Sequence, residues 1–168
     1  FNLEVFFLKE RFRDFLEIGK SDKTIIQDRS IYEGVHVFAK NNHNQGTISD
    51  LDFETYMDLF EQMLSMTREP DLMIYLRASI EHLVGNIQKR GREYEQTMQL
   101  DYLKGLNKQY EEFINNNYKG RVLIIDVNNL DYEHRPEDFR FITDKIDQII
   151  YGLFPLNEKR PAESPSGF

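Results

Sequence analysis

Short apolar runs that end in polar residues occur three times along the chain and predict strands of a parallel sheet. The runs lie at 24–27, 72–76 and 122–125. A strand covered on both faces is apolar almost throughout, and polar residues after such strands lie where ligands bind in open α/β sheets. We therefore expect three adjacent parallel strands, with Asp28, Arg77 and Asp126 at one end of the sheet.

Apolar residues at three- and four-residue steps predict amphipathic helices around these runs. The stripes lie within 5–15, 53–64, 80–87, 100–113 and 139–149, and 31–41 is a further candidate. Alternating strands and helices indicate an α/β fold with a three-layer parallel sheet. Three strands are few for such a sheet, and the chain opens inside a helical stripe without a capping residue. We therefore expect further N-terminal strands upstream of Phe1.

Composition and charge narrow the possible functions. The 168 residues fit one domain, expected at 1–154, with a disordered tail at 155–168. No apolar run is long enough to span a membrane and no signal peptide opens the chain, so a cytoplasmic location is expected. The absence of cysteine from the sequence excludes disulfides and cysteine nucleophiles. The formal net charge of -8 disfavours a nucleic acid polymer as partner, although clustered arginines can still bind a small phosphate.

The segment 88–96 is the densest candidate for phosphate binding. Arg90 and Arg92 flank Gly91, which places two guanidinium groups on a backbone that can bend around a ligand. Such groups bind phosphate oxygens in pairs and stabilise the charge on a transferring phosphoryl group. A solvated helix end with cations near its C-terminus explains the same residues, and taken alone they favour that simpler interpretation.

Asp28 and Arg29 form a second candidate site, after the first apolar run. A carboxylate there can hold Mg²⁺ through water, and the adjacent arginine can reach a phosphate. An ion pair or a helix cap explains these residues as well. Asp126 and Asn128 follow the last run, where a loop can touch an adenine ring, but a turn accounts for them equally.

Aromatic and amide side chains near the strand ends are candidates for binding a nucleobase. They are Phe1, Asn2, Tyr32, Phe38, Tyr94 and Gln96. Flat rings can wall a base and an amide can read its edge. Core packing explains the aromatic residues too, most simply for Phe38.

Taken in order, these motifs resemble the deoxynucleoside kinase family. The matching segments are Asp28-Arg29-Ser30-Ile31-Tyr32, Phe38-Ala39, Tyr75-Leu76-Arg77-Ala78-Ser79, Arg90-Gly91-Arg92 with Glu95, Leu100-x-x-Leu103 and Asp126-Val127-Asn128. The likeness covers residues 1–151 and looks closest to bacterial purine-type members. It implies a P-loop nucleoside kinase fold and transfer of the ATP γ-phosphate to the 5′-hydroxyl of a deoxynucleoside, with ATP and Mg²⁺ as cofactors. A homodimer formed through helices near the N-terminus is also implied.

The resemblance implies a role for each matching residue. Asp28 is the acidic residue near Mg²⁺, and Arg29 orients the reacting 5′-oxygen and phosphate. Arg90 and Arg92 are lid arginines that clamp the donor phosphates, and Glu95 binds the 3′-hydroxyl of the deoxyribose.

The base-binding positions follow in the same way. Phe1-Asn2 aligns with a Phe-Gln pair whose amide reads the base, and Phe38 aligns with an aromatic residue that stacks near it. The loop after Asp126, with Asn128, packs on the donor adenine.

Some positions depart from the family pattern. Asn2 is one methylene shorter than the family's glutamine, Gly34 replaces an acidic base reader of some members, and Asn86 replaces an extra lid arginine of animal members. The 168 residues contain no Gly-x-x-x-x-Gly-Lys-Ser/Thr loop, and the family's catalytic base lies upstream of Phe1. We therefore expect a C-terminal part of a kinase that is inactive alone.

Two alternatives remain open. One is a nucleoside monophosphate kinase similar to thymidylate kinase, which shares the sheet, an Asp-Arg motif and an arginine lid. The Arg92-x-x-Glu95 spacing, and Ser30 with Tyr32, favour a nucleoside acceptor over a monophosphate. The other alternative is a non-catalytic kinase fragment that acts as an interaction module.

Overall fold

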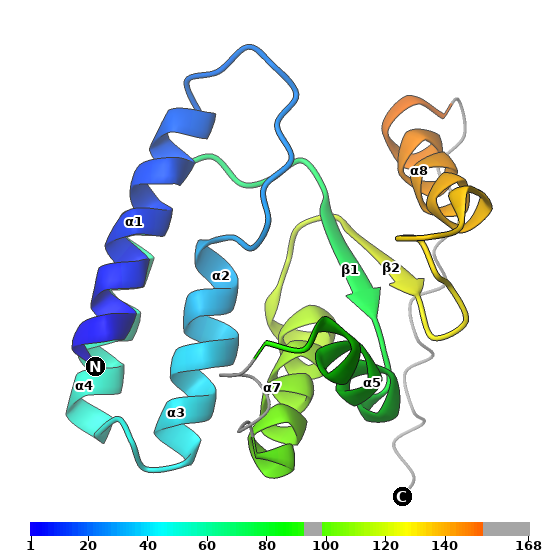
Figure 1. Cartoon of the computed structure of the whole chain (residues 1–168). Helices are drawn as coiled ribbons and strands as arrows, with labels where there is room; N and C mark the ends of the chain where they lie inside the picture. The colour runs from blue at the N-terminus through cyan, green and yellow to red at the C-terminus, as the bar shows by residue number, and fades with distance from the viewer. Residues whose placement is uncertain (93–98, 153–168) are drawn as a thin grey trace, which may run out of the picture.

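The computed structural model describes residues 1–92 and 99–152, in which helices cover both faces of a two-stranded parallel sheet (Figure 1). Strand β1 spans Met73–Arg77 and strand β2 spans Val122–Asp126. Their register runs from Met73 opposite Val122 to Arg77 opposite Asp126. Both strands were predicted from their apolar runs.

The predicted helical segments are confirmed. The helices are α1 (Asn2–Ile18), α2 (Ile31–Glu33), the π-helical turn η1 (Gly34–Ala39), α3 (Lys40–Asn44), α4 (Asp50–Leu64), α5 (Ile80–Arg90), α7 (Leu100–Glu112), the π-helical turn η2 (Phe113–Asn117) and α8 (Pro136–Tyr151). Ser49 and Ser79 begin α4 and α5 by accepting a backbone N–H in the first turn. Such caps satisfy donors that have no partner inside the helix. Gly91 ends α5 with a φ of 66°, a left-handed conformation that glycine adopts without strain.

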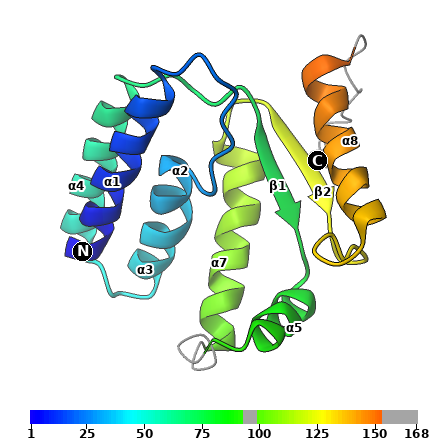
Figure 2. The same ribbon diagram turned by 45° about the horizontal axis from the view of Figure 1, so that its top comes forward.

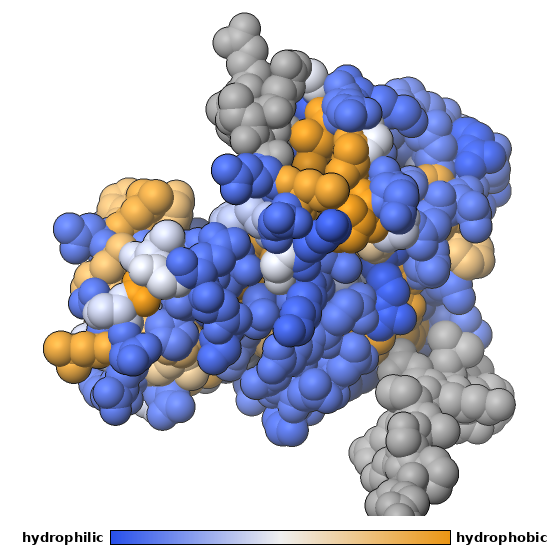
Figure 3. Space-filling model, turned by 90° about the horizontal axis from the view of Figure 1, so that it is seen from below, coloured by the Kyte–Doolittle hydropathy of each residue, from blue (hydrophilic) through white to orange (hydrophobic). Residues whose placement is uncertain are grey.

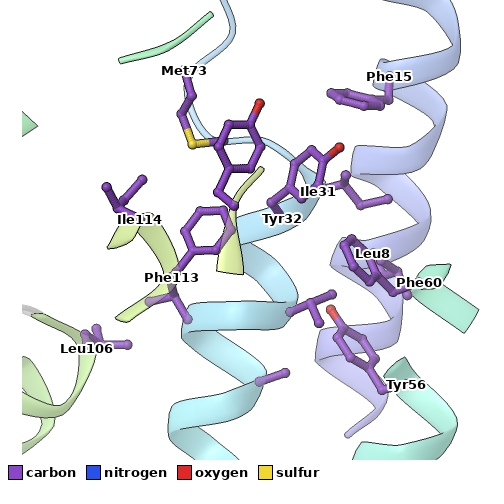
Figure 4. Close-up of a cluster of buried hydrophobic side chains, with 14 of the residues drawn as sticks. Leu8, Phe15, Ile31, Tyr32, Tyr56, Phe60, Met73, Leu106, Phe113 and Ile114 are labelled. Carbon is purple, nitrogen blue, oxygen red and sulfur yellow. The ribbon is translucent and has the colours of Figure 1, made fainter. Parts of the chain in front are cut away.

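The larger core lies between the sheet and helices α1, α2, η1, α4 and α7. Its centre is a group of aromatic rings, in which Tyr32 lies between Phe15 and Phe113 (Figure 4). A second core covers the opposite face of the sheet, where Leu123 and Ile125 pack with Ile142 of α8. Figure 2 shows α7 and α8 on opposite sides of the strands. The three-layer α/β arrangement is therefore confirmed.

The predicted strand at 24–27 is wrong. These residues connect α1 to α2 without strand pairing in the described part of the chain. Ile25 is 44% exposed and Ile26 is 89% exposed, so neither face of the run is covered. A strand forms only where a neighbour accepts and donates its backbone hydrogen bonds. An apolar run by itself is therefore insufficient to form a strand.

Two other expectations concern the ends of the molecule and the membrane. The predicted tail at 155–168 lies outside the described residues. No helix within the described ranges combines the length and the apolar character needed to cross a bilayer.

Candidate functional site

The turn before α2 presents Asp28 and Arg29. Arg29 has a φ of 60°, a left-handed conformation that costs a non-glycine residue about 1–2 kcal/mol. Nη1 of Arg11, on α1, donates to the carbonyl oxygens of Asp28 and Arg29, at 2.6 Å from each. The next residue, Ser30, begins α2 with a capping box that it forms with Glu33. A cation on one side and a helix cap on the other therefore hold this turn.

The guanidinium group of Arg29 lies on an aromatic wall. Its Cζ is 4.9 Å from the ring centroid of Phe38, which is half-buried on η1. The Phe38 ring meets Tyr110 of α7 edge to face, with centroids 6.4 Å apart. We call Arg11, Asp28, Arg29, Phe38 and Tyr110 the Arg29 cluster. It joins three segments that are far apart in the sequence.

The hydroxyl of Tyr110 lies within the electrostatic reach of this turn. Burial is the main cause that raises the pKa of Tyr110 to about 12, and the charge of Glu33 acts in the same direction. Arg29 and Arg11 oppose this rise, whereas Asp28 adds to it. Tyr110 therefore stays a neutral hydroxyl whose pKa responds to both charged residues of the turn.

A second cluster surrounds the carboxylate of Glu111 on α7. Its Oε1 accepts from the Tyr75 hydroxyl at 3.0 Å and from Arg77 Nε at 2.9 Å, and its Oε2 accepts from Arg77 Nη2 at 2.9 Å. Tyr75 and Arg77 are two residues apart on β1, which places them on one face of the strand. The ring of Tyr75 stacks on Tyr110 with centroids 5.9 Å apart and an interplanar angle of 10°. We call Tyr75, Arg77 and Glu111 the Glu111 cluster.

Arg77 and Asp126 lie at the same end of the sheet, as predicted, whereas the predicted place of Asp28 at the end of a third strand is wrong because 24–27 form no strand. Arg77 lies opposite Asp126 in the ladder. Asp126 Oδ1 accepts from the backbone N and the Nδ2 of Asn128, both at 2.9 Å, and Asn128 Oδ1 accepts from the backbone N of Ser79 at 2.8 Å. Asp126 and Asn128 thus tie the end of β2 to the start of α5. Their contact with an adenine ring stays a prediction.

The two candidate phosphate-clamping arginines flank the end of α5. Arg90 and Arg92 are exposed, and the left-handed Gly91 between them turns the chain away from the helix axis. Bending of this segment around a bound phosphate stays a prediction. Glu95, with Tyr94 and Gln96, lies outside the described residues, so its contact with the sugar stays a prediction.

Three predicted substrate contacts have different surroundings. Tyr32 is 7% exposed and packs in the aromatic core, so the structure shows a packing role for its ring. Phe1 and Asn2 are exposed at the beginning of α1. Ligand binding by all three stays a prediction.

Glu4 is the half-buried polar side chain in the first turns of α1, and the sequence reasoning missed it. Its Oε1 accepts from Asn42 Nδ2 at 2.8 Å. Burial raises the pKa of Glu4, and the hydrogen bond from Asn42 opposes that rise. The only signal in the sequence was one acidic residue among apolar positions of the helical stripe.

The pKa of Tyr102, on α7, responds to the charges of both Glu4 and Arg29. Burial raises the pKa of the Tyr102 hydroxyl, the charge of Glu4 adds to the rise, and the charge of Arg29 opposes it. A half-buried hydroxyl therefore lies within electrostatic reach of a carboxylate and a guanidinium group. These three side chains supply the hydrogen-bonding groups that a polar ligand would need.

Metal binding can be tested against the donor set of the site. Within residues 1–92 and 99–152, no group of three or more His, Asp or Glu side chains could hold a metal ion. Asp28 is a single exposed carboxylate, and Arg11 bonds its backbone carbonyl. One carboxylate fits Mg²⁺, which at phosphate sites keeps several waters and takes further oxygens from the substrate.

Comparisons with known proteins bear on the chemistry of this site. The family model for deoxynucleoside kinases matches residues 1–151. A deoxyadenosine/deoxycytidine kinase from Bacillus subtilis is 33% identical over 90% of this chain and 70% of its own length. A deoxyguanosine kinase from Lactobacillus johnsonii is 31% identical over 87% of this chain and 68% of its own length. The structure of a deoxyadenosine kinase from M. mycoides with bound dATP has a TM-score of 0.73 at 30% identity, over 87% of this chain and 73% of that one. The sequence matches and the structural match therefore both lead to deoxynucleoside kinases.

Proposed function

Because this chain belongs to the deoxynucleoside kinase family, we propose that it is the acceptor-binding and arginine-bearing part of an ATP-dependent deoxynucleoside 5′-kinase. The observation that carries the proposal is the Arg29 cluster. There a guanidinium group lies on an aromatic ring, and it belongs to a turn that also carries an acidic residue and is held by a second arginine. Charged groups held in advance at a reacting phosphate are the main requirement of phosphoryl transfer.

The residues of the turn and the lid would share the work on the donor. Asp28 would hold a Mg²⁺ ion, which when bound neutralises charge on the donor phosphates. Arg29 would donate to the phosphate and the 5′-oxygen and keep them in line. Arg90 and Arg92 would clamp the donor phosphates, and Asp126 and Asn128 would place a loop beside the adenine.

The acceptor would lie beside α1, η1 and α7. Phe38 offers a half-buried ring, Tyr102 offers a half-buried hydroxyl whose pKa responds to Glu4 and Arg29, and Glu4 offers a half-buried carboxylate. We propose a purine deoxynucleoside as the acceptor, which the relatives named for deoxyadenosine and deoxyguanosine support. The carboxylate of Glu4 replaces Asn2 as our candidate for reading the base, because Glu4 is the half-buried side chain of the two.

We also propose a cytoplasmic homodimer formed through an apolar face of α1 and α4. Leu3, Phe6 and Phe7 on α1 are 64%, 51% and 50% exposed, and Leu51 on α4 is 73% exposed. Figure 3 shows apolar surface at the end of the molecule where Figure 1 places these helices. Exposed apolar patches of this kind are typical of protein interfaces. Sedimentation of Phe6→Ser and Phe7→Ser variants tests the proposal, and an unchanged dimer would contradict it.

A coupled assay with ATP, Mg²⁺ and deoxyadenosine or deoxyguanosine tests the proposed reaction. A chain that also carries the P-loop segment expected upstream of Phe1 should phosphorylate the nucleoside, whereas residues 1–168 alone should not, because the P-loop positions the donor. Arg92→Ala should lower kcat on the order of 10³, as loss of an arginine contact does in related chemistry. Arg140→Ala, which removes an exposed arginine of α8 far from this segment in the sequence, should leave kcat unchanged. A lower Tm with unchanged kcat for Arg92→Ala would return that residue to a structural role.

A further inference from the structure

The Glu111 cluster has no part in the proposed chemistry. Among the described residues of the site, however, the carboxylate of Glu111 accepts the most hydrogen bonds. Glu111 accepts from Tyr75, twice from Arg77, and from Asn115 Nδ2 at 3.3 Å. The paired bonds from Arg77 form the two-pronged geometry that fixes both direction and distance. One side chain of α7 is thus locked to two side chains of β1.

The aromatic rings beside Glu111 form a row of contacts that reaches Arg29. Tyr75, whose hydroxyl Glu111 holds, stacks on Tyr110. Tyr110 meets Phe38 edge to face, and the face of Phe38 carries the guanidinium group of Arg29. The contacts run without a gap from Glu111 to Arg29 and cross from β1 to α7, to η1 and to the turn before α2.

We propose that Glu111 is a positioning residue for Arg29. By holding the Tyr75 hydroxyl, Glu111 stops that ring from sliding over Tyr110. The stacked pair of Tyr75 and Tyr110 then fixes the position of the ring that Phe38 contacts. A cation on a ring face follows the ring, so the position of the Arg29 guanidinium group depends on this row of aromatic side chains. Packed side chains can carry such coupling between distant residues, but the coupling must be measured to be shown.

This inference rests on the proposed function, in which Arg29 orients the reacting groups. The test is a double-mutant cycle on kcat in the full-length enzyme. Glu111→Gln keeps the shape of the side chain and removes its charge, and we expect it to lower kcat about tenfold. In an Arg29→Ala background the same substitution should change kcat less than about twofold, because the group that it positions is gone. Glu112→Gln, an exposed neighbour on α7, is the matched control and should change neither background.

The outcomes separate the inference from the proposed function. A full-length protein that phosphorylates no nucleoside would refute the proposed function. An active enzyme in which Glu111→Gln lowers kcat equally in both backgrounds would overturn the inference, because general structural damage acts whether or not Arg29 is present. Unchanged kcat in the Arg29-containing enzyme would overturn it as well. If Glu111→Gln does not fold, Tyr75→Phe in the same two backgrounds decides, since it removes the held hydroxyl and keeps the ring.

Discussion

Replacing Arg29 by glycine and by alanine separates backbone strain from side-chain chemistry at the turn. The φ of 60° at Arg29 costs a residue with a Cβ about 1–2 kcal/mol. Glycine avoids this strain, but it gives up about 0.5–1 kcal/mol of backbone entropy on folding. The difference makes Arg29→Gly more stable than Arg29→Ala by about 0.5–1 kcal/mol.

The side chain adds a second contribution to stability. Both variants lose the contact between the Arg29 guanidinium group and the ring of Phe38, which is worth about 0.5–1 kcal/mol at an exposed site. Arg29→Ala should therefore be less stable than the native protein by about that amount, and Arg29→Gly should be close to native. Neither variant has a guanidinium group, so both should lose kcat strongly. Stability would return with glycine while activity would not, as expected where strain is stored at a functional site.

Urea unfolding followed by circular dichroism, with the coupled kinase assay in parallel, measures both quantities. Gly46→Ala is the control. Gly46 has a φ of 74° and an added Cβ would meet nothing within 4 Å, so this variant should lose about 0.5–1 kcal/mol, which is the strain of about 1–2 kcal/mol less the entropy of about 0.5–1 kcal/mol. If Gly46→Ala behaves in this way and Arg29→Gly is nevertheless less stable than Arg29→Ala, the left-handed turn at Arg29 and its retention by Arg11 would be refuted.

Three further predictions concern stability. Gly85→Ala should raise the free energy of unfolding by about 0.5–1 kcal/mol, because the added methyl meets nothing within 4 Å in α5. Gly105→Ala should lower it by about 1–3 kcal/mol, because the methyl would overlap Oδ1 of Asn41, which is 3% exposed. Denaturant unfolding checks both signs. Burial, with the charge of Lys40 as a second cause, lowers the pKa of His36 below its usual 6.5. The unfolded chain then binds more protons, so the fold should lose stability as pH falls from 6.5 towards the lower folded-state pKa. His36→Phe should remove this part of the pH dependence of Tm, and an unchanged slope would assign it to other groups.

The sequence by itself determined the helices, two strands and the order of the motifs. The hydrogen bonds of a helix are made within its own segment, so three- and four-residue spacing of apolar residues locates the helices without knowledge of their neighbours. The runs that became β1 and β2 could be located for a different reason. They are apolar on both faces and each is connected to a helix. The matching motifs were enough to predict the family.

Only the tertiary structure decided which side chains meet. Residues 24–27 have the composition of a strand, but a strand requires a partner that local sequence does not show. The contact of Glu4 with Asn42 depends on which side of α1 faces Asn42, and Tyr32 became a core residue because rings from three other elements surround it. Glu111 carried no motif at all. Its role depends on Tyr75 and Arg77, which precede it by more than thirty residues and reach it only because parallel strands and their crossover helices bring such distant segments into contact.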